Sequence, residues 1–191
     1  PLFAPARGLA ALLGEQSAGR LLLVNPRGTV WNGASGVVFA SGAGGADAIS
    51  LPGALAWKLR PSWGGLSAAL ELSCCTSKPL GLRASPGVRG LRLHLLDGQS
   101  RWPAALLAGF GAPFNTLKPE GVLDLTTQNL ELRLDRQQLA FQGRATLDAT
   151  DISSSLSTLR PMGSYRVVLE GGSAPSLVLT SREGSSLRLA G

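Results

Sequence analysis

Alternation of apolar and polar side chains with a period of two residues is the feature that most constrains the fold of this chain. Leucine recurs at Leu91, Leu93 and Leu95, with Arg92 and His94 between them. Successive side chains of a β-strand point to opposite faces, so each such run builds one apolar and one polar face. The pattern returns at Leu130/Leu132/Leu134, Leu147/Ala149, Tyr165/Val167/Leu169, Leu177/Leu179 and Leu187/Leu189. We expect the leucine triplets at 91–95 and 130–134 to share one buried face of a sheet.

Turn signals and a shortage of helical segments favour an antiparallel sheet. Asn32-Gly33, Asp97-Gly98 and Glu183-Gly184 follow or separate the apolar runs, and such pairs are typical of tight hairpin turns. Only residues 5–13 and 102–110 have helical character, each with proline near its start and glycine near its end. No long alternation of strand and helix occurs, which argues against a parallel sheet.

These observations predict an all-β domain that spans residues 1–191. With so few helices, the apolar face must be covered by curling of the sheet or by another molecule. We expect a strongly twisted antiparallel meander, rolled towards an incomplete barrel or half-pipe, with one or two short helices. Such a shape has a lined groove and at least one free strand edge, and both are binding features. Residues 41–46 (SGAGGA) form a low-complexity loop that we expect to be mobile.

The composition indicates apolar surface beyond that of an ordinary soluble domain. Apolar residues make up 44% and charged residues only 16%, where about 25% charged is usual. The surplus suggests a surface for a protein partner, a lipid or a second copy of the chain. The net charge of +6 comes mainly from single, scattered arginines. Because no basic run and no interleaved aromatic platform occur, we expect no nucleic-acid partner.

The residue types of common catalytic and metal sites are sparse. The single histidine, His94, lies on the polar side of a strand, which is typical of a surface residue. No G-x-S-x-G, phosphate-binding glycine loop or H-E-x-x-H motif occurs. We therefore expect no catalytic residue, no cofactor and no metal. An enzyme remains the alternative if the fold assembles a pair of the scattered carboxylates.

The two cysteines, Cys74 and Cys75, are adjacent. In an oxidising compartment they have three options: a disulfide between neighbours, a bridge to another chain, or two free thiols. Neighbouring strand side chains point apart, so a disulfide between them requires a turn. The following residues, Thr76 to Pro79, would tolerate that turn. We interpret the pair as a local staple or inert thiols.

No segment reaches the roughly 18 consecutive apolar residues of a membrane span. The chain begins at proline, and we expect a signal peptide or a membrane anchor to precede it in the full-length protein.

Three segments carry a resemblance to a known family. Residues 25–33 (NPRGTVWNG), 55–61 (LAWKLRP) and 156–166 (LSTLRPMGSYR) resemble, in the same order, segments of type II secretion system protein N. Met162 stands where the family pattern has leucine. The resemblance spans most of the chain and has no catalytic residues to carry over.

The resemblance implies an accessory component of the bacterial type II secretion system. Its expected place is the periplasmic face of the inner membrane, held there by an N-terminal anchor in the full-length protein. Its expected role is to bind other subunits of the machine and support export across the outer membrane. The alternative is a periplasmic half-pipe that binds or transports a lipid or acyl chain.

Two sets of residues are the candidate binding features. Trp31, Trp57 and Trp63 are candidate core or groove-lining anchors. Leu177, Val178 and Leu179 are the candidate edge-pairing strand, in a predicted hairpin of residues 176–180 and 186–190. Little charge protects this hairpin, which favours pairing with a strand of a second copy or of another subunit.

Overall fold

A computed structural model describes residues 4–40, 48–87, 90–135 and 139–188 of the chain. Within these residues, twelve strands join in one antiparallel sheet, accompanied by three short helices. The strands are β1 Leu21–Gly28, β2 Asn32–Ala40, β3 Ala48–Ser50, β4 Leu55–Ser62, β5 Gly65–Leu72, β6 Leu80–Pro86, β7 Gly90–Leu95, β8 Gly98–Pro103, β9 Glu120–Asp135, β10 Leu139–Ser153, β11 Gly163–Glu170 and β12 Ser176–Ser181. The helices are α1 Ala6–Gln16, the 3₁₀ helix η1 Ala104–Phe110 and α2 Phe114–Leu117. The loop predicted at 41–46 lies outside the described residues.

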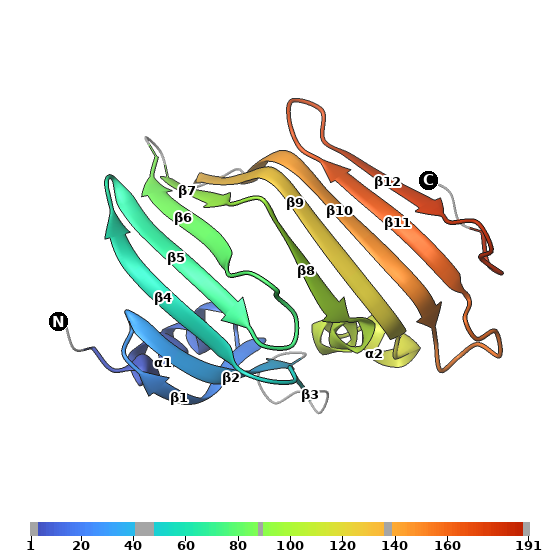
Figure 1. The fold of residues 1–191 in the computed structure, drawn as a ribbon, viewed down its shortest axis with the longest axis horizontal. Helices are drawn as coiled ribbons and strands as arrows, with labels where there is room; N and C mark the ends of the chain where they lie inside the picture. Colours follow the sequence, from blue (N-terminus) through green and yellow to red (C-terminus); the bar gives the residue numbers. More distant parts are fainter. Residues whose placement is uncertain (1–3, 41–47, 88–89, 136–138, 189–191) are drawn as a thin grey trace.

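The strands follow one another as a meander, and the all-β prediction is confirmed. Their order is β1-β2-β4-β5-β6-β7-β9-β10-β11-β12, while β3 pairs with β2 and β8 pairs with β9. In Figure 1 the sheet runs from the blue N-terminal strands at one end to the red C-terminal strands at the other. Because β1 and β12 lie at opposite ends of this order, the sheet is open.

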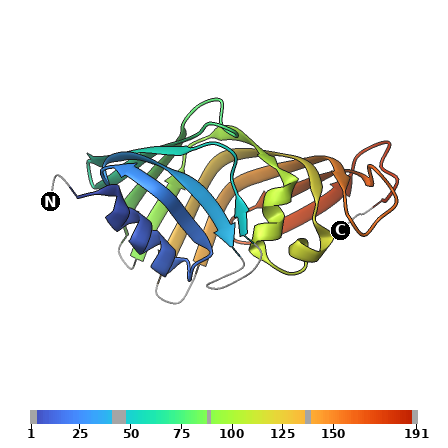
Figure 2. The ribbon, with the colours of Figure 1, turned by 90° about the horizontal axis from the view of Figure 1, so that it is seen from below.

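Irregularities in the long strands β9 and β10 bend the sheet. The β9–β10 register shifts between Gln142 and Arg144 and again between Thr150 and Ser153. At the first shift, Gly143 has a φ of 96°, and a Cβ there would collide with the carbonyl group of Asn129. Such bulges bend a strand and increase its twist. Figure 2 shows the resulting arch, with α1 and η1 on its inner side.

The predicted turn at Asp97-Gly98 is not a hairpin. These residues separate β7 from β8, and both strands pair with successive parts of β9. The Asp97 carboxylate accepts a hydrogen bond from the backbone N–H of Asn129 at 2.6 Å. This bond attaches the connection between β7 and β8 to the bulge in β9. Asp97 and Gly98 therefore lie at an interruption between two consecutive strands that run in the same direction along β9.

The other two predicted turn pairs also differ from hairpin turns. Asn32 and Gly33 begin β2, and the positive φ of the preceding turn belongs to Gly28, at 85°. Gly184 has the expected positive φ of 82°, but no strand follows it within the described residues.

Both predicted helices are present with shifted ends. α1 continues through Gly14 to Gln16, and η1 begins only at Ala104, because Trp102 and Pro103 belong to β8. The single turn of α2 was not predicted. No helix in the described part of the chain is long and apolar enough to cross a membrane.

The core lies between the sheet and the helices on its inner face, which we define as the face that carries Trp57, Leu93 and Leu147. One buried cluster gathers under α1 and η1 and comprises Ala6, Leu23, Val37, Leu51, Trp57, Leu72, Cys75 and Leu106. A second comprises Ala104, Leu123, Ala149 and Tyr165. Trp102 packs against both clusters and links them.

The two leucine triplets share the inner face, as the sequence predicts. Leu91, Leu93 and Leu95 lie directly opposite Leu134, Leu132 and Leu130. They are only partly buried, however, because the triplets lie outside both core clusters. Leu91 and Leu134 are each 41% exposed. The inner face therefore extends beyond the part that the helices cover.

Candidate functional site

At one end of the sheet, no strand of the described residues pairs with the outer edge of β12 at Leu177 and Leu179. This strand pairs in regular register with β11 and lies at the end of the strand order. It contains no charged residue and no proline, and Leu177 is 62% exposed and Val178 46% exposed. Natural edge strands are usually guarded by lysine, proline or a bulge. The edge of β12 has none of these.

The backbone groups of Leu177 and Leu179 point away from the sheet. The N–H of Arg182 donates to the carbonyl of Ser164 at 2.8 Å. Hydrogen-bonded pairs alternate along an antiparallel ladder, so this bond also makes Val178 a hydrogen-bonded partner of β11. The N–H of Val178 therefore points towards β11, and the N–H groups that point away from β11 belong to Leu177 and Leu179.

The second half of the predicted C-terminal hairpin is not a strand. After the turn at Gly184, residues 185–188 run irregularly back towards β11. The N–H of Leu187 donates to the carbonyl of Met162 at 2.9 Å, and its carbonyl accepts from the Tyr165 hydroxyl at 3.2 Å. These bonds hold the segment away from β12; residues 189–190 lie outside the described residues.

The opposite edge, at β1, is protected. The Ser17 hydroxyl accepts from the N–H of Leu21 at 3.0 Å and donates to its carbonyl at 3.2 Å. The β1–β2 register is broken between Val24 and Arg27, and Pro26 lies in that break. A bulge and a proline both disfavour further pairing. Within the part of the chain that the structure describes, β12 is therefore the end of the sheet that is available for pairing.

Trp31 lies in the turn between β1 and β2, and Trp57, in β4, is hydrogen-bonded to that turn. Trp57 is 2% exposed, and its indole N–H donates to the carbonyls of Val30 at 3.0 Å and Thr29 at 3.3 Å. Trp31 is half-buried, and its buried indole nitrogen has no hydrogen-bond partner among the described residues. Trp57 is thus a core residue that fastens this turn to β4.

Trp63 lies elsewhere, at the tip of the turn between β4 and β5. Its side chain is fully exposed, at 105%. It is neither a core nor a groove-lining residue, because the tight turn with Gly64 at a φ of 79° places it beyond the ends of both strands. A large apolar side chain in this position is free to meet another molecule.

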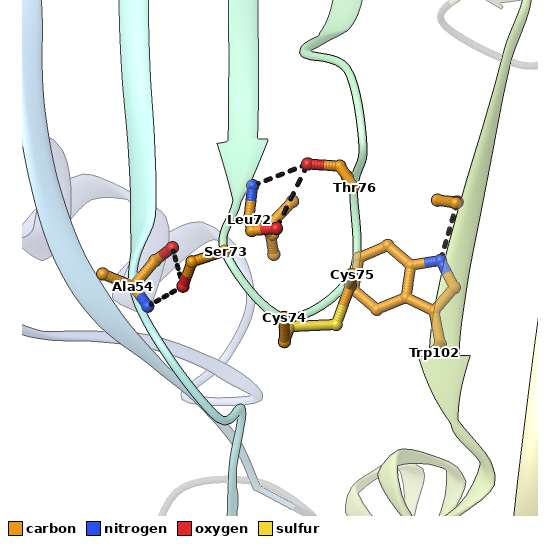
Figure 3. Close-up of a disulfide and its surroundings, with 8 residues drawn as sticks. Ala54, Leu72, Ser73, Cys74, Cys75, Thr76 and Trp102 are labelled. Carbon is orange, nitrogen blue, oxygen red and sulfur yellow. Dashed lines mark hydrogen bonds between the residues drawn. A yellow bond between two sulfur atoms is a disulfide. The ribbon is translucent and has the colours of Figure 1, made fainter.

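Cys74 and Cys75 form a disulfide in the turn that follows β5 (Figure 3). Cys75 is buried in the first core cluster, whereas Cys74 is exposed. The Thr76 hydroxyl accepts from the N–H of Leu72 at 3.0 Å and donates to its carbonyl at 3.2 Å, which closes the turn.

This turn also joins separate parts of the sheet. The Ser73 hydroxyl accepts from the N–H of Ala54, just before β4, at 3.0 Å. The carbonyl of Cys75 accepts from the N–H of Arg101 in β8 at 2.8 Å. The disulfide therefore lies in a tie between the N-terminal strands and β8. A hollow of about 590 Å³ adjoins it, with the ion pair of Arg101 and Asp124 in its wall.

A row of four charges crosses the outer face of β8, β9, β10 and β11. Arg101, Asp124, Asp148 and Arg166 lie opposite one another in that order. Each arginine binds its neighbouring carboxylate through two nitrogens, at 2.7 and 3.4 Å for Asp124 and at 2.7 and 3.0 Å for Asp148. This row could not be predicted from the sequence, because only the strand register brings its members together. Their polar positions in the alternation were the available signal.

The only histidine, His94, lies on the outer face of β7, opposite Arg83 in β6 and Glu131 in β9. A hydrogen bond from Arg133 is the main cause that lowers the pKa of Glu131. Among the residues that the structure describes, no three His, Cys, Asp or Glu side chains are grouped in a way that would hold a metal ion.

Comparison with known protein families gives a match over most of the chain. The family model described as "Type II secretion system (T2SS), protein N" matches residues 19–191. No curated protein and no solved structure matches the chain.

Proposed function

The chain belongs to the family of type II secretion system protein N, and from this premise we propose that it binds another subunit of the machine through β12. Membership makes it a component of a secretion system of the bacterial envelope. In the proposed role it is an accessory without catalytic activity, and it supports export by holding its partner in place.

The edge of β12 at Leu177 and Leu179, which no strand of the described residues covers, is the observation that carries this proposal. An extended segment of a partner can add to an exposed edge, where main-chain hydrogen bonds give affinity and alternate side chains give specificity. Leu177 and Leu179 would offer their backbone groups, and the side chain of Val178 would contact the partner from the outer face. The protected edge at β1 leaves β12 as the pairing surface.

We place the domain at the periplasmic face of the inner membrane. The disulfide of Cys74 and Cys75 supports this location, because disulfides persist in oxidising compartments such as the bacterial periplasm and are rare in the cytosol.

Proline at Leu179 tests the proposal. Leu179→Pro removes an outward N–H and no internal hydrogen bond, so we expect a folded protein with at least a tenfold weaker hold on its partner, roughly the loss of one to two hydrogen bonds. Leu179→Val keeps the donor and is the matched control. Val178→Pro removes a bond to β11 and should instead loosen β12 itself.

The measurement is co-purification with the other secretion subunits from cells that carry each variant, together with circular dichroism of the purified chain. Unchanged co-purification of a folded Leu179→Pro protein would show that the edge of β12 does not bind the partner subunit. Transfer of the contact to a second copy of the chain would show that β12 serves self-association instead.

The part of the inner face that no described helix covers supports a second candidate, the binding of a lipid or acyl chain. Leucines at 91, 93, 132 and 134 line this face beyond the two core clusters, and the sheet is open there. In this role the purified protein carries lipid that mass spectrometry identifies, and Leu132→Asp releases it while Val178→Asp, on the outer face, does not. Protein purified without lipid would remove this candidate.

A further inference from the structure

The outer face of the sheet carries a positively charged hollow far from β12 in the strand order. It lies over β4, β5 and β6, has a volume of about 410 Å³, and is lined by Lys58, Arg60 and Arg83. The proposed edge pairing does not involve these residues.

The register of the three strands places Lys58, Arg60 and Arg83 around the hollow. Arg60 lies opposite Ser67, and Ser67 lies opposite Arg83. Neighbouring strands are about 4.8 Å apart, so the backbones of the two arginines are separated by roughly 10 Å, a span that two long side chains can close around one anion. Lys58 occupies the next outer position on β4, beside the small residues Ala69 and Gly81, and the side chain of Leu96 covers Gly81.

The three charges are not neutralised by the chain. Within the described residues, the ion pairs of the structure engage six arginines, namely Arg101, Arg133, Arg144, Arg160, Arg166 and Arg182. None involves Lys58, Arg60 or Arg83, and Glu71, the acidic residue of β5, forms no ion pair with them. Lys58 and Arg60 lie on the same face of β4, Arg83 lies two strands away on that face, and their like charges repel one another unless an anion lies between them. The hollow therefore favours a bound anion such as a phosphate.

The same hairpin carries an apolar side chain at its tip. Trp63 lies between β4 and β5, three residues beyond Arg60, and is fully exposed. Tryptophan is favoured at the boundary between membrane and water, where its ring lies at the level of the headgroups. Binding of a soluble phosphate would not involve this apolar side chain, whereas binding of a membrane surface would.

We propose that the β4–β5 hairpin binds the surface of an anionic phospholipid membrane. A headgroup phosphate occupies the hollow between Lys58, Arg60 and Arg83, and Trp63 enters the headgroup layer. This contact goes beyond the proposed subunit binding and uses a different part of the sheet.

Vesicle flotation of the purified chain tests this site. We expect binding to vesicles of phosphatidylcholine with phosphatidylglycerol, and little binding to phosphatidylcholine alone. The double variant R60Q/R83Q should lower the partition coefficient about tenfold or more, since each basic residue near an anionic surface contributes noticeably. R7Q/R20Q removes the same charge from α1 and the residue before β1, and it should change the partition coefficient far less. Brominated lipid should quench tryptophan fluorescence in the native chain and not in Trp63→Phe.

Three results would overturn the proposal. An equal decrease of the partition coefficient in R60Q/R83Q and R7Q/R20Q would show that net charge alone, and not this hollow, causes binding. Chemical shift changes at the hollow with inorganic phosphate, but no flotation, would assign the hollow to a soluble anion. Flotation without quenching at Trp63 would place the membrane contact elsewhere. Thermal unfolding of R60Q/R83Q verifies its fold, and Leu179→Pro should float normally, which separates this site from the subunit-binding edge.

Discussion

Asp148 shows how single residues on the outer face depend on one another. It lies opposite Asp124 on β9 and Arg166 on β11, and Arg182 approaches it to 3.7 Å. The hydrogen bond from Arg166 is the main cause that lowers the pKa of Asp148, and the charges of Arg166 and Arg182 add to it against the opposing effect of burial. The ion pairs with Arg101 and Arg166 offset the repulsion between the neighbouring carboxylates of Asp124 and Asp148.

Asp148→Asn should lower the free energy of unfolding at neutral pH by about 1 kcal/mol, as expected for a half-buried pair that solvent still screens. Because the pKa of Asp148 is lower in the folded than in the unfolded state, its contribution is present above about pH 4 and is lost as the pH falls through the folded value. Urea unfolding should therefore separate the variant from the native chain at neutral pH and not in acid. Asp151→Asn is the control, and an equal difference at both pH values would contradict this account.

The disulfide is a second residue-scale feature, and we expect it to be a modest staple. Replacing both Cys74 and Cys75 with serine should leave the fold intact and cost less than the ~3 kcal/mol of a 15-residue loop, because so small a ring constrains the unfolded chain little. The hydrogen bonds of Ser73 and Thr76 remain to hold the turn. Denaturant unfolding measures the cost, and a chain that no longer folds would show that the tie depends on the disulfide.

At the scale of elements, alternation predicted the strands and the shared face of the leucine triplets but not where strands bend. An extra residue at a bulge reverses the parity of the pattern, as between Leu125 and Leu130 in β9. The failed prediction at Leu187 has a similar origin. Its alternation is genuine, yet hydrogen bonds with Met162 and Tyr165 hold that segment away from β12. Such long-range partners leave no local signal.

Gly143 tests whether the bulge shapes the sheet. Gly143→Ala should destabilise the chain by about 1–3 kcal/mol, because alanine is strained at this positive φ and its Cβ collides with the Asn129 carbonyl. Gly8→Ala, in α1, meets no neighbouring atom and should be neutral or stabilise by up to about 1 kcal/mol. Thermal unfolding of both variants decides, and a Gly143→Ala protein as stable as the native chain would mean that the bend does not need glycine.

At the scale of the whole molecule, the open sheet offers different surfaces at its two ends. The N-terminal end is closed by α1 and by the protected edge of β1, and the cationic hollow lies on its outer face. The C-terminal end finishes in β12, whose outer edge at Leu177 and Leu179 no described strand covers. The sequence pointed to Leu177, Val178 and Leu179 through their lack of charge. It could not place Trp63 or group Lys58, Arg60 and Arg83, because strand register and turn position decide both.

Site-specific photocrosslinking in cells that assemble the complete secretion system shows whether β12 contacts another subunit. A photoreactive residue at Val178 reports on the edge of β12, and one at Leu22, also exposed on the outer face, reports on the edge of β1. Mass spectrometry of the products should identify another secretion subunit crosslinked from position 178 and none from position 22. No subunit product from position 178, or the same products from both positions, would contradict subunit binding through β12.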